Sequence, residues 1–402
     1  MFGQDYRINP AVIKVMGVGG GGCNAVNSMI NSGIKSAEFI SVNTDSQALL
    51  LSKTDNRIQL GEKLTKGLGA GSNPDIGEQA AEESKQEIAE RLQGTDLLFI
   101  AAGMGGGTGT GAASVIARIA RELGILTVAV VTKPFSFEGR VRNNNAIKGI
   151  ANLKKHVDTL VVIPNDKLLQ FLPAQTSMLD AFKVADDMLK QGIVGIVDLI
   201  ATPSLINLDF ADVNTVMRNQ GLAHMGVGRA KGENRVIESV RQAVSSPLLE
   251  TTIEGAKSII LNVTGGKDLM LTEVSEAAQL VQGIIDPDAN IIFGSTIDDT
   301  LSDEVKITVI ATGFSPVTPV EQKEDKPSFN FNEQSFDNSV PPLIREIEAQ
   351  ERRAQEVQVE TPSQPVVDEV KVEESNQPSV NDAVPEKKGR ELPAFMRKLF
   401  KK

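Results

Sequence analysis

The sequence predicts an α/β fold: a doubly wound, mainly parallel sheet, a long central helix, a smaller α/β domain and a disordered tail. Three observations support this prediction. Short apolar runs alternate with helical stretches in the first part of the chain, which is typical of a doubly wound sheet. An amphipathic pattern then spans residues 176–200, and the composition changes sharply near Pro316. The 402 residues exceed the usual single-domain range of roughly 100 to 200, so we expect two domains and a tail.

The apolar runs predict the order of the elements. Strands are expected at residues 12–16, 38–42, 97–101, 126–131 and 160–163, with helical segments between most of them. Residues 176–200 carry apolar side chains at helical spacing, so one long helix could bridge two domains. The second domain should contain helices at 233–244 and 271–285, and strands at 258–263, 291–296 and 305–312. The predicted segments are an N-terminal extension (1–10), a first domain (11–175), the central helix (176–202) and a second domain (203–315).

The composition beyond Pro316 predicts a disordered linker over residues 316–385. This part and the terminus beyond it hold ten of the 18 prolines and one of the 35 glycines, and polar residues dominate. Residues 386–402 differ, because apolar side chains recur at helical spacing among lysines and arginines. These side chains are Leu392, Phe395, Met396, Leu399 and Phe400. We expect a short helix that folds on a partner, and the alternative is a frayed, merely charged terminus.

Charge and cysteine content exclude several classes of protein. A formal net charge of -11 argues against nucleic-acid binding, because neutralising phosphates requires a basic surface. Cys23 is the single cysteine, so neither a disulfide within the chain nor a thiolate metal cluster is expected. The N-terminus has no export signal, and no apolar run approaches the roughly 18 to 20 residues that span a bilayer. We expect a cytoplasmic protein.

Two glycine clusters, at residues 17–22 and 103–111, each lie between a predicted strand and the next helix. Glycine lets backbone N–H groups and the following helix dipole converge on a phosphate. The first cluster alone also fits a dinucleotide fingerprint, with Asp45 placed to hold a ribose, so a nicotinamide-dependent oxidoreductase stays open. Such an enzyme does not need the second cluster, and the Gly-Lys-Ser/Thr of a P-loop is absent from it. The pair of clusters therefore favours a different class of nucleotide-binding protein.

The second cluster resembles the signature of the tubulin/FtsZ family, and the neighbouring Ala101-Ala102 and Ala112-Ala113 resemble the FtsZ side of it. The resemblance covers about residues 8–314. It implies binding and hydrolysis of GTP, with Mg²⁺ held by the phosphates rather than by dedicated protein ligands. Carried over residue by residue, the implied nucleotide contacts are Gly20, Gly21, Gly22, Cys23, Asn24, Asn43, Asp45, Gly69, Ala70, Gly71, Gly103, Gly105, Gly106, Gly107, Thr108, Gly109, Thr132, Glu138, Arg142 and Asn165.

The choice of base is predicted from Phe182 and Asp186, which lie four apart on the long helix and so share a face. An aromatic ring can stack on a purine. A carboxylate can accept the N1–H and the exocyclic amine of guanine, whereas the N1 lone pair of adenine would repel it. Without the family resemblance, a core phenylalanine and a solvated aspartate would be the favoured explanation of these residues.

The candidate catalytic residues are Asn207, Asp209 and Asp212, which precede and open a predicted helix. On a first helical turn the two carboxylates project the same way and can orient a water and a counter-ion for attack on a γ-phosphate. The alternative is that they merely cap the helix. His156 and His224, the two histidines, lie beside no nucleophile.

The resemblance further implies that this acidic loop acts on the GTP of the next subunit, so that the chain polymerises head to tail and hydrolysis depends on assembly. In this family the filament forms the ring at the bacterial division site, under the inner face of the membrane. Residues 391–399 resemble the peptide that docks membrane-anchoring and regulatory division proteins. The basic residues around it could also touch acidic lipid, as a weaker or indirect contact. A member that binds GTP and assembles without hydrolysis remains the alternative within the family.

Overall fold

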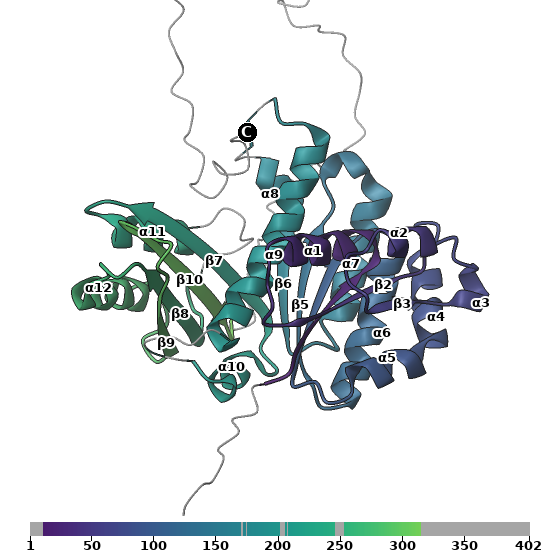
Figure 1. Ribbon diagram of the computed structural model, residues 1–402, viewed down its shortest axis with the longest axis horizontal. Coiled ribbons are helices and arrows are strands. Elements are labelled where there is room, and N and C mark those ends of the chain that lie inside the picture. Colours follow the sequence, from purple (N-terminus) through teal and green to yellow (C-terminus); the bar gives the residue numbers. More distant parts are fainter. Residues whose placement is uncertain are drawn as a thin grey trace, which may run out of the picture. The chain divides into compact units, whose positions relative to one another are not determined.

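In this computed structural model the described residues are 11–169, 172–173, 175–201, 206, 208–245 and 253–314 (Figure 1). Their strands form a ten-stranded sheet in the order β3-β2-β1-β4-β5-β6-β7-β10-β8-β9. The strands are β1 (Ile13–Val18), β2 (Glu38–Asn43), β3 (Arg57–Gln59), β4 (Leu97–Gly103), β5 (Leu126–Lys133), β6 (Thr159–Pro164), β7 (Gly221–Lys231), β8 (Ser258–Gly265), β9 (Asn290–Ile297) and β10 (Glu304–Thr312).

Helices cover the sheet on both faces. They are α1 (Gly19–Asn31), α2 (Ser46–Leu50), α3 (Glu62–Thr65), α4 (Pro74–Glu83), α5 (Lys85–Leu92), α6 (Thr108–Glu122), α7 (Arg140–Leu153), α8 (Asn165–Leu169), α9 (Met178–Ala201), α10 (Phe210–Met217), α11 (Arg235–Val244) and α12 (Leu271–Gln282), with a short 3₁₀ turn η1 (Ser136–Glu138). The mixed α/β architecture and the long helix predicted over 176–200 are confirmed.

Strands β1 to β6 run parallel, so their carboxyl ends share one edge of the sheet. Val18, the last residue of β1, pairs with Val42 on one side and Ala102 on the other. Gly103 pairs with Thr132 at the end of β5. Because ligands bind outside the carboxyl ends of strands in such sheets, this edge is the expected place for a site. Both glycine clusters begin there.

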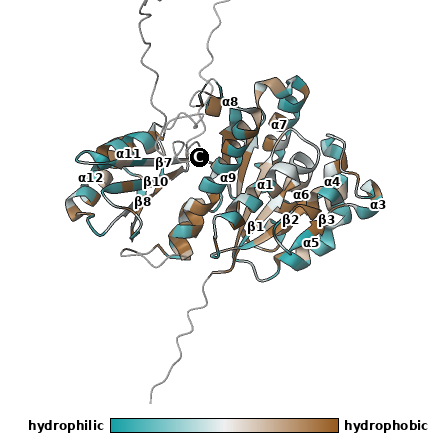
Figure 2. Cartoon of the chain, turned by 45° about the horizontal axis from the view of Figure 1, so that its top comes forward, coloured by the Kyte–Doolittle hydropathy of each residue, from teal (hydrophilic) through white to brown (hydrophobic). Residues whose placement is uncertain are grey.

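Two apolar cores stabilise strands β1 to β6 and the helices around them. Side chains of α1, α9 and α10 pack on one face of the strands, and those of α4, α5, α6 and α7 pack on the other. The strands are buried on both faces, which explains their nearly continuous apolar runs. Helix α9 carries both hydrophobic and hydrophilic residues along its length (Figure 2), because one side faces the core and the other does not.

Strand β7 was not predicted, and its glycines explain why. Gly226 and Gly228 interrupt the apolar pattern, and glycine in a strand usually weakens it. Here α11 lies so close that a Cβ at Gly226 would stand 1.7 Å from the carbonyl oxygen of Ala243, and one at Gly228 would stand 1.8 Å from that of Ser239. The glycines therefore allow α11 to approach β7 closely. No local sequence pattern indicates this approach.

Strands β7, β10, β8 and β9 form the second half of the sheet, mainly antiparallel, with β8 and β9 parallel. Helices α11 and α12 pack on one face of these strands. On the other face, Ile260 and Ile310 join the core that contains α9. Residues 159–161 of β6 pair with 221–223 of β7, so the sheet continues from the first half into the second.

Several predictions fall outside the described residues. These are the extension 1–10, the linker 316–385 and the terminal peptide 386–402. The domain boundaries, which the described elements do not test, stay predictions. Among the described helices, none is both long and apolar enough to cross a bilayer.

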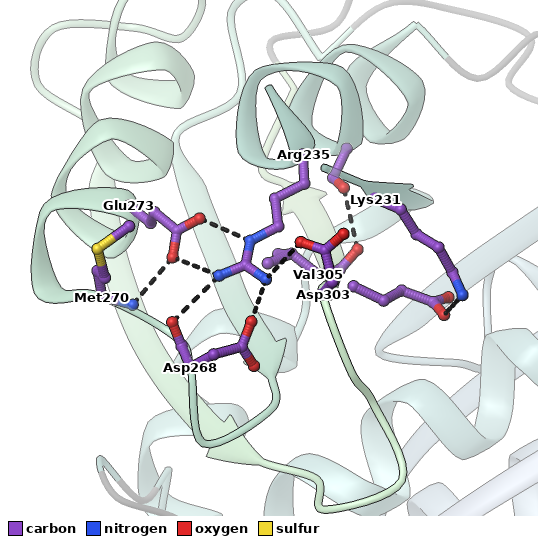
Figure 3. A network of polar contacts seen from close by, with 9 residues as sticks. Lys231, Arg235, Asp268, Met270, Glu273, Asp303 and Val305 are labelled. Atoms are coloured by element: carbon purple, nitrogen blue, oxygen red, sulfur yellow. Dashed lines mark hydrogen bonds and ion pairs between the residues drawn. The ribbon is translucent and has the colours of Figure 1, made fainter. Parts of the chain in front are cut away.

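The buried side chain of Arg235 organises an ionic network in the second half of the chain (Figure 3). Its side chain is 6% exposed, and it forms a two-point contact with Glu273, with Nε–Oε1 and Nη2–Oε2 distances of 2.7 and 2.9 Å. Asp268 accepts from Nη1, and Asp303 lies 3.6 Å from the same nitrogen. Glu273 also accepts from the backbone N–H of Met270, which caps α12. The network thus joins the start of α11 to the start of α12.

We predict that Glu273→Ala lowers the free energy of unfolding by about 3 kcal/mol, because it leaves a buried guanidinium without its two-point partner. Hydrogen bonding to Arg235 lowers the pKa of Glu273, so the contribution of this pair is present near neutral pH and is lost as the pH falls. Urea unfolding of the full chain measures the change.

Asp299→Asn is the matched control, since the Lys267–Asp299 pair is exposed on both sides and should change stability by less than about 0.5 kcal/mol. Equal midpoints for Glu273→Ala and wild type would contradict a structural role for the network.

Candidate nucleotide-binding site

The two glycine clusters meet at the carboxyl edge of the sheet. A Cβ at Gly19 would stand 2.8 Å from the backbone nitrogen of Gly109, and one at Gly21 would stand 3.5 Å from the Cα of Gly103. A Cβ at Gly22 would stand 2.2 Å from the carbonyl oxygen of Ala101. Gly19 and Gly22 therefore have no room for a side chain, and Gly19 also has a positive φ, whereas a side chain at Gly21 would make only an ordinary contact with Gly103.

Two helix N-termini converge at this edge without side-chain caps. Helix α1 follows Val18 and α6 follows Gly107, and neither N-cap residue makes a side-chain cap hydrogen bond. Neither helix has an acidic residue in its first turn. The first-turn N–H groups and the positive ends of both helix dipoles are therefore available to an anion.

The segment 69–71 lies beside the second glycine loop, and its contact with the terminal phosphate stays a prediction. The hydroxyls of Thr44 and Thr108 lie 2.7 Å apart and share a hydrogen bond. Gly69 donates its N–H to the carbonyl of Thr44 over 3.2 Å. A Cβ at Gly107 would stand 2.8 Å from the Cβ of Ala70. Thr44, which was not predicted, thus ties three loops together.

Asn43 and Asp45 lie at the same edge, and Asp45 has a structural role. Its Oδ1 accepts from the N–H groups of Gln47 and Ala48 at 2.9 and 3.2 Å, so it caps α2. The Oδ1 of buried Asn43 accepts from the N–H of Asp45 at 3.3 Å. These bonds fix the loop next to the glycine clusters.

The site has room for a ligand and an unsatisfied polar atom. A Cβ at Gly20, Gly71 or Gly106 would meet no atom within 4 Å, so open space borders all three loops. The Oδ1 of Asn165, buried at the start of α8, makes no hydrogen bond. A buried acceptor without a partner is costly unless a ligand or water supplies a donor. These features fit a phosphate-bearing nucleotide.

Cys23 can contact a nucleotide only through its backbone. Its Sγ contacts the carbonyl oxygens of Gly17 and Val42 at 3.6 and 3.7 Å, inside the sheet. Burial raises the pKa of this thiol to about 11, so it stays protonated and unreactive. The neighbouring Asn24 is exposed.

Thr132 is the second-last residue of β5, and Glu138 and Arg142 follow that strand. Thr132 accepts from the N–H of Met104 at 2.9 Å, which places the second glycine loop against β5. Glu138 and Arg142 form an ion pair of 2.6 Å, and Glu138 also accepts from the N–H of Phe135. Glu138 and Arg142, two of the predicted ribose and phosphate contacts, therefore lie together.

Phe182 belongs to a cluster of three aromatic rings. Its ring meets that of Phe135 edge-on, with centroids 5.4 Å apart, and that of Phe137 at 6.4 Å. Phe135 and Phe137 stack on each other at 5.1 Å. Sequence reasoning missed both, although they follow the carboxyl end of a predicted strand. Phe182 remains 38% exposed, so its ring can contact a base.

Asp186 lies one turn further along α9 and is partly buried. Burial and, to a smaller extent, the charge of Asp187 raise its pKa to about 7. Its protonation state therefore changes close to neutral pH. A carboxyl group beside an aromatic ring, with a perturbed pKa, suits the recognition of two N–H donors.

Asp209 and Asp212 cap α10 reciprocally. The Oδ1 of Asp209 accepts from the N–H of Asp212 at 2.8 Å, and the Oδ2 of Asp212 accepts from the N–H of Asp209 at 3.3 Å. The capping alternative is thus confirmed as geometry, and it leaves both side chains accessible in part. Asn207, the third predicted catalytic residue, lies outside the described residues.

Helix α10 lies at the opposite edge of the sheet from the glycine loops. Its last residue, Met217, accepts a hydrogen bond from Thr159, the first residue of β6. Since β6 runs parallel to β1 and β4, this is the amino-terminal edge. The acidic loop and the glycine loops are therefore not parts of one pocket within a chain. Among the described residues, no cluster of His, Cys, Asp or Glu could hold a metal ion.

Comparisons with known proteins agree with this geometry. Residues 12–173 match the GTPase domain of the tubulin/FtsZ family, and residues 221–315 match the C-terminal domain of the FtsZ family. An FtsZ dimer of M. jannaschii is 48% identical, with a TM-score of 0.73 over 76% of this chain and 89% of that one.

More distant structures share the fold. The GDP-bound monomer of CetZ1 from Haloferax volcanii is 21% identical, with a TM-score of 0.66 over 76% of this chain and 96% of that one. The GTPγS-bound protofilament of CetZ2 from the same organism is 19% identical, with a TM-score of 0.64 over 76% of this chain and 94% of that one. The oxidoreductase alternative is therefore rejected. The chain belongs to the tubulin/FtsZ family of GTPases, on its FtsZ branch.

Proposed function

We propose that this cytoskeletal GTPase polymerises head to tail and hydrolyses GTP at each junction, forming the division ring of a bacterial cell. One observation carries the proposal: the glycine loops and the acidic loop lie at opposite edges of one sheet. A strand of six residues, such as β6, separates these edges by roughly 20 Å. Asp209 and Asp212 therefore cannot reach a nucleotide held by their own chain.

A second copy would complete the site. If its α10 covered the glycine loops, the carboxylates of Asp209 and Asp212 would orient water for in-line attack on the γ-phosphate. Mg²⁺, held through the phosphates, would neutralise charge there. A contact between unlike surfaces repeats without closing, so it generates a filament. The dimer of the M. jannaschii relative and the protofilament of CetZ2 are consistent with such assembly.

Exposed apolar side chains at both edges support this contact. Near the nucleotide edge Leu68 is 85% exposed and Phe137 is 55% exposed. Near α10, Ile206 is 44% exposed, and it pairs with Ser295 of the edge strand β9. A partner that covered these side chains would remove their apolar area from water. A head-to-tail junction would bury both sets at once.

Guanine selection would depend on ionised Asp186. Its carboxylate would accept the N1–H and the exocyclic amine, while Phe182 offers a face for the ring. Loss of the γ-phosphate would remove contacts to the glycine loops and weaken the junction. The filament would then turn over.

The terminal peptide, residues 386–402, is proposed to dock membrane-anchoring and regulatory division proteins. Its apolar residues recur at helical spacing after a polar linker, which suits binding as a short helix in a groove. The filament would then lie in the cytoplasm at midcell, under the membrane. Direct contact with acidic lipid would be secondary.

We predict that GTP hydrolysis per molecule, measured with Mg²⁺ and excess GTP, rises from near zero above a threshold protein concentration, together with light scattering. Asp212→Ala should bind GTP normally but lose about 100-fold or more in turnover, because it removes a group that acts in the transition state. Constant activity per molecule at high dilution would show a site complete within one chain.

The control is Thr215→Ala, one turn further along α10, whose hydroxyl bonds only the carbonyl of Ala211 among the described residues.

Mixing two inactive variants gives a sharper test. Gly107→Val should spoil the pocket, because even a Cβ there would approach Ala70 closely, yet it leaves α10 intact. Asp212→Ala mixed with Gly107→Val should regain turnover at mixed junctions.

We predict that GTP affinity falls as the pH drops below about 7, by up to about tenfold per unit. Asp186, with a raised pKa, must lose its proton before it can accept two N–H groups.

Without nucleotide, ionising the half-buried Asp186 disfavours the folded state. Its contribution to the free energy of unfolding therefore decreases as the pH rises from about 3.9, its unfolded pKa, through the folded value.

Asp186→Asn supplies the control for this pH dependence. It should bind GTP more weakly, with a flatter profile between pH 6 and 8. Titration of the nucleotide phosphates affects both proteins alike, so the difference between the two profiles isolates Asp186. Identical profiles would rule out Asp186 as the titrating group.

We predict that a chain ending at Lys387, fused to a fluorescent protein in bacterial cells, still forms filaments but no midcell ring. A Phe395→Ala, Leu399→Ala variant keeps every basic residue of the peptide. If docking uses the apolar face, this variant should fail as the truncation does. Normal rings with the truncated chain would remove the proposed role of the peptide.

A further inference from the structure

A network of four side chains joins α1 to α9 next to Asp186. The Oγ of Ser28 on α1 donates to Oδ1 of Asp187 at 3.1 Å. Lys190, one turn along α9, lies 2.7 Å from the same oxygen and donates to the Oγ of Ser32 at 3.3 Å. We name Ser28, Ser32, Asp187 and Lys190 the α1–α9 clamp.

The clamp is largely shielded from solvent. The side chain of Asp187 is 13% exposed and that of Lys190 is 22% exposed. Elsewhere α1 and α9 pack through apolar side chains, among them Val26 and Met29 of α1 and Val184 and Met188 of α9. Apolar contacts are non-directional, whereas shielded hydrogen bonds to a charged group fix one geometry. The clamp therefore sets the register of the two helices.

Each helix of the clamp carries part of the nucleotide site. Helix α1 begins with the glycines of the first loop, and Ser28 lies within the same helix. On α9, Asp187 directly follows Asp186, and the charge of Asp187 contributes to the raised pKa of Asp186. The distance from the first glycine loop to the base-recognising carboxylate is thus set across the α1–α9 contact.

We propose that Asp187, held by Ser28 and Lys190, is a positioning residue for guanine recognition, which fixes α9 against α1 so that the Asp186 carboxylate meets both N–H groups of the base. The proposal rests on the GTP binding proposed above. It assigns Asp187 a role in specificity without contact to the nucleotide. A small shift of α9 would break the contact between Asp186 and the more distant of the two N–H donors of guanine. The contacts between the glycine loops and the phosphates would remain.

The clamp also borders a cleft of about 490 Å³ between α9 and the second half of the sheet. Asp187 and Lys190 line its wall on α9 together with Asp198, while Arg229 of β7 and Lys306 of β10 line the facing wall. Because Lys190 pairs with Asp187, the charge of Asp187 is committed to α1 and α9 rather than to these cations. The clamp therefore attaches α9 to α1 rather than across the cleft to β7 and β10.

The test compares the affinities of GTP and inosine triphosphate, which lacks the exocyclic amine. Equilibrium binding to the full chain is measured in EDTA, below the assembly threshold, and at pH 8.5, where Asp186 is ionised in every variant. Wild type should prefer GTP. Asp187→Ala should reduce the GTP-to-inosine triphosphate affinity ratio by about threefold or more.

Asp187→Asn should keep most of the ratio, because an amide oxygen can still accept from Ser28. Ser28→Ala should lower it in part, and adding Ser28→Ala to Asp187→Ala should lower it no further, since both remove the same contact. Asp180→Asn is the matched control: it removes an exposed aspartate of α9 that pairs with Lys183 of the same helix and should leave the ratio unchanged.

An unchanged ratio in Asp187→Ala, or an equal loss of affinity for both nucleotides, would overturn the positioning role. Failure of wild type to bind GTP would instead refute the proposed function, so the two failures are distinguishable.

Discussion

The backbone contact between two glycine loops is the constraint on which the rest of this structure depends. Gly19 meets Gly109, and Gly22 meets the carbonyl of Ala101, at distances that leave no room for a side chain. This contact brings the N-termini of α1 and α6 to one edge of the sheet with their N–H groups uncapped. An anion is the natural partner of such an arrangement. Adjacent loops are then tied to it through Thr44 and Thr108.

Under the proposed function, helix α9 would make this edge selective for guanine. Its first half bears Phe182 and Asp186, its flank is held to α1 by Asp187, and its apolar side joins the core shared with both halves of the sheet. One helix therefore links the proposed base-recognising residues to the second half of the chain. The acidic loop follows α9 and lies at the opposite edge from the glycine loops. Under the proposed function, each edge would hold half of a site and assembly would join the two halves.

Much of the fold followed from local patterns. The parallel strands β1, β2, β4, β5 and β6 appear as continuous apolar runs, and α9 as a long amphipathic pattern, so their existence could be predicted with boundaries shifted by one or two residues. The three-residue strand β3 has no such run and was not predicted. Strand β7 could not be predicted, since Gly226 and Gly228 are explained only by the close approach of α11. The continuation of one sheet through β6 and β7 was equally hidden, because strand pairing is set by contacts distant in sequence.

The sequence by itself determined which residues are candidates for the chemistry: two glycine loops, an aromatic ring and carboxylate on one helix, and an acidic pair at a helix start. Tertiary structure decided what each of them does. In the folded chain Asp45 caps α2, and the thiol of Cys23 contacts carbonyl oxygens of β1 and β2. Phe135 and Phe137 lie around Phe182, and burial raises the pKa of Asp186. These outcomes depend on burial and on neighbours brought in by packing. A linear pattern does not contain them, because desolvation and distance are properties of the folded chain.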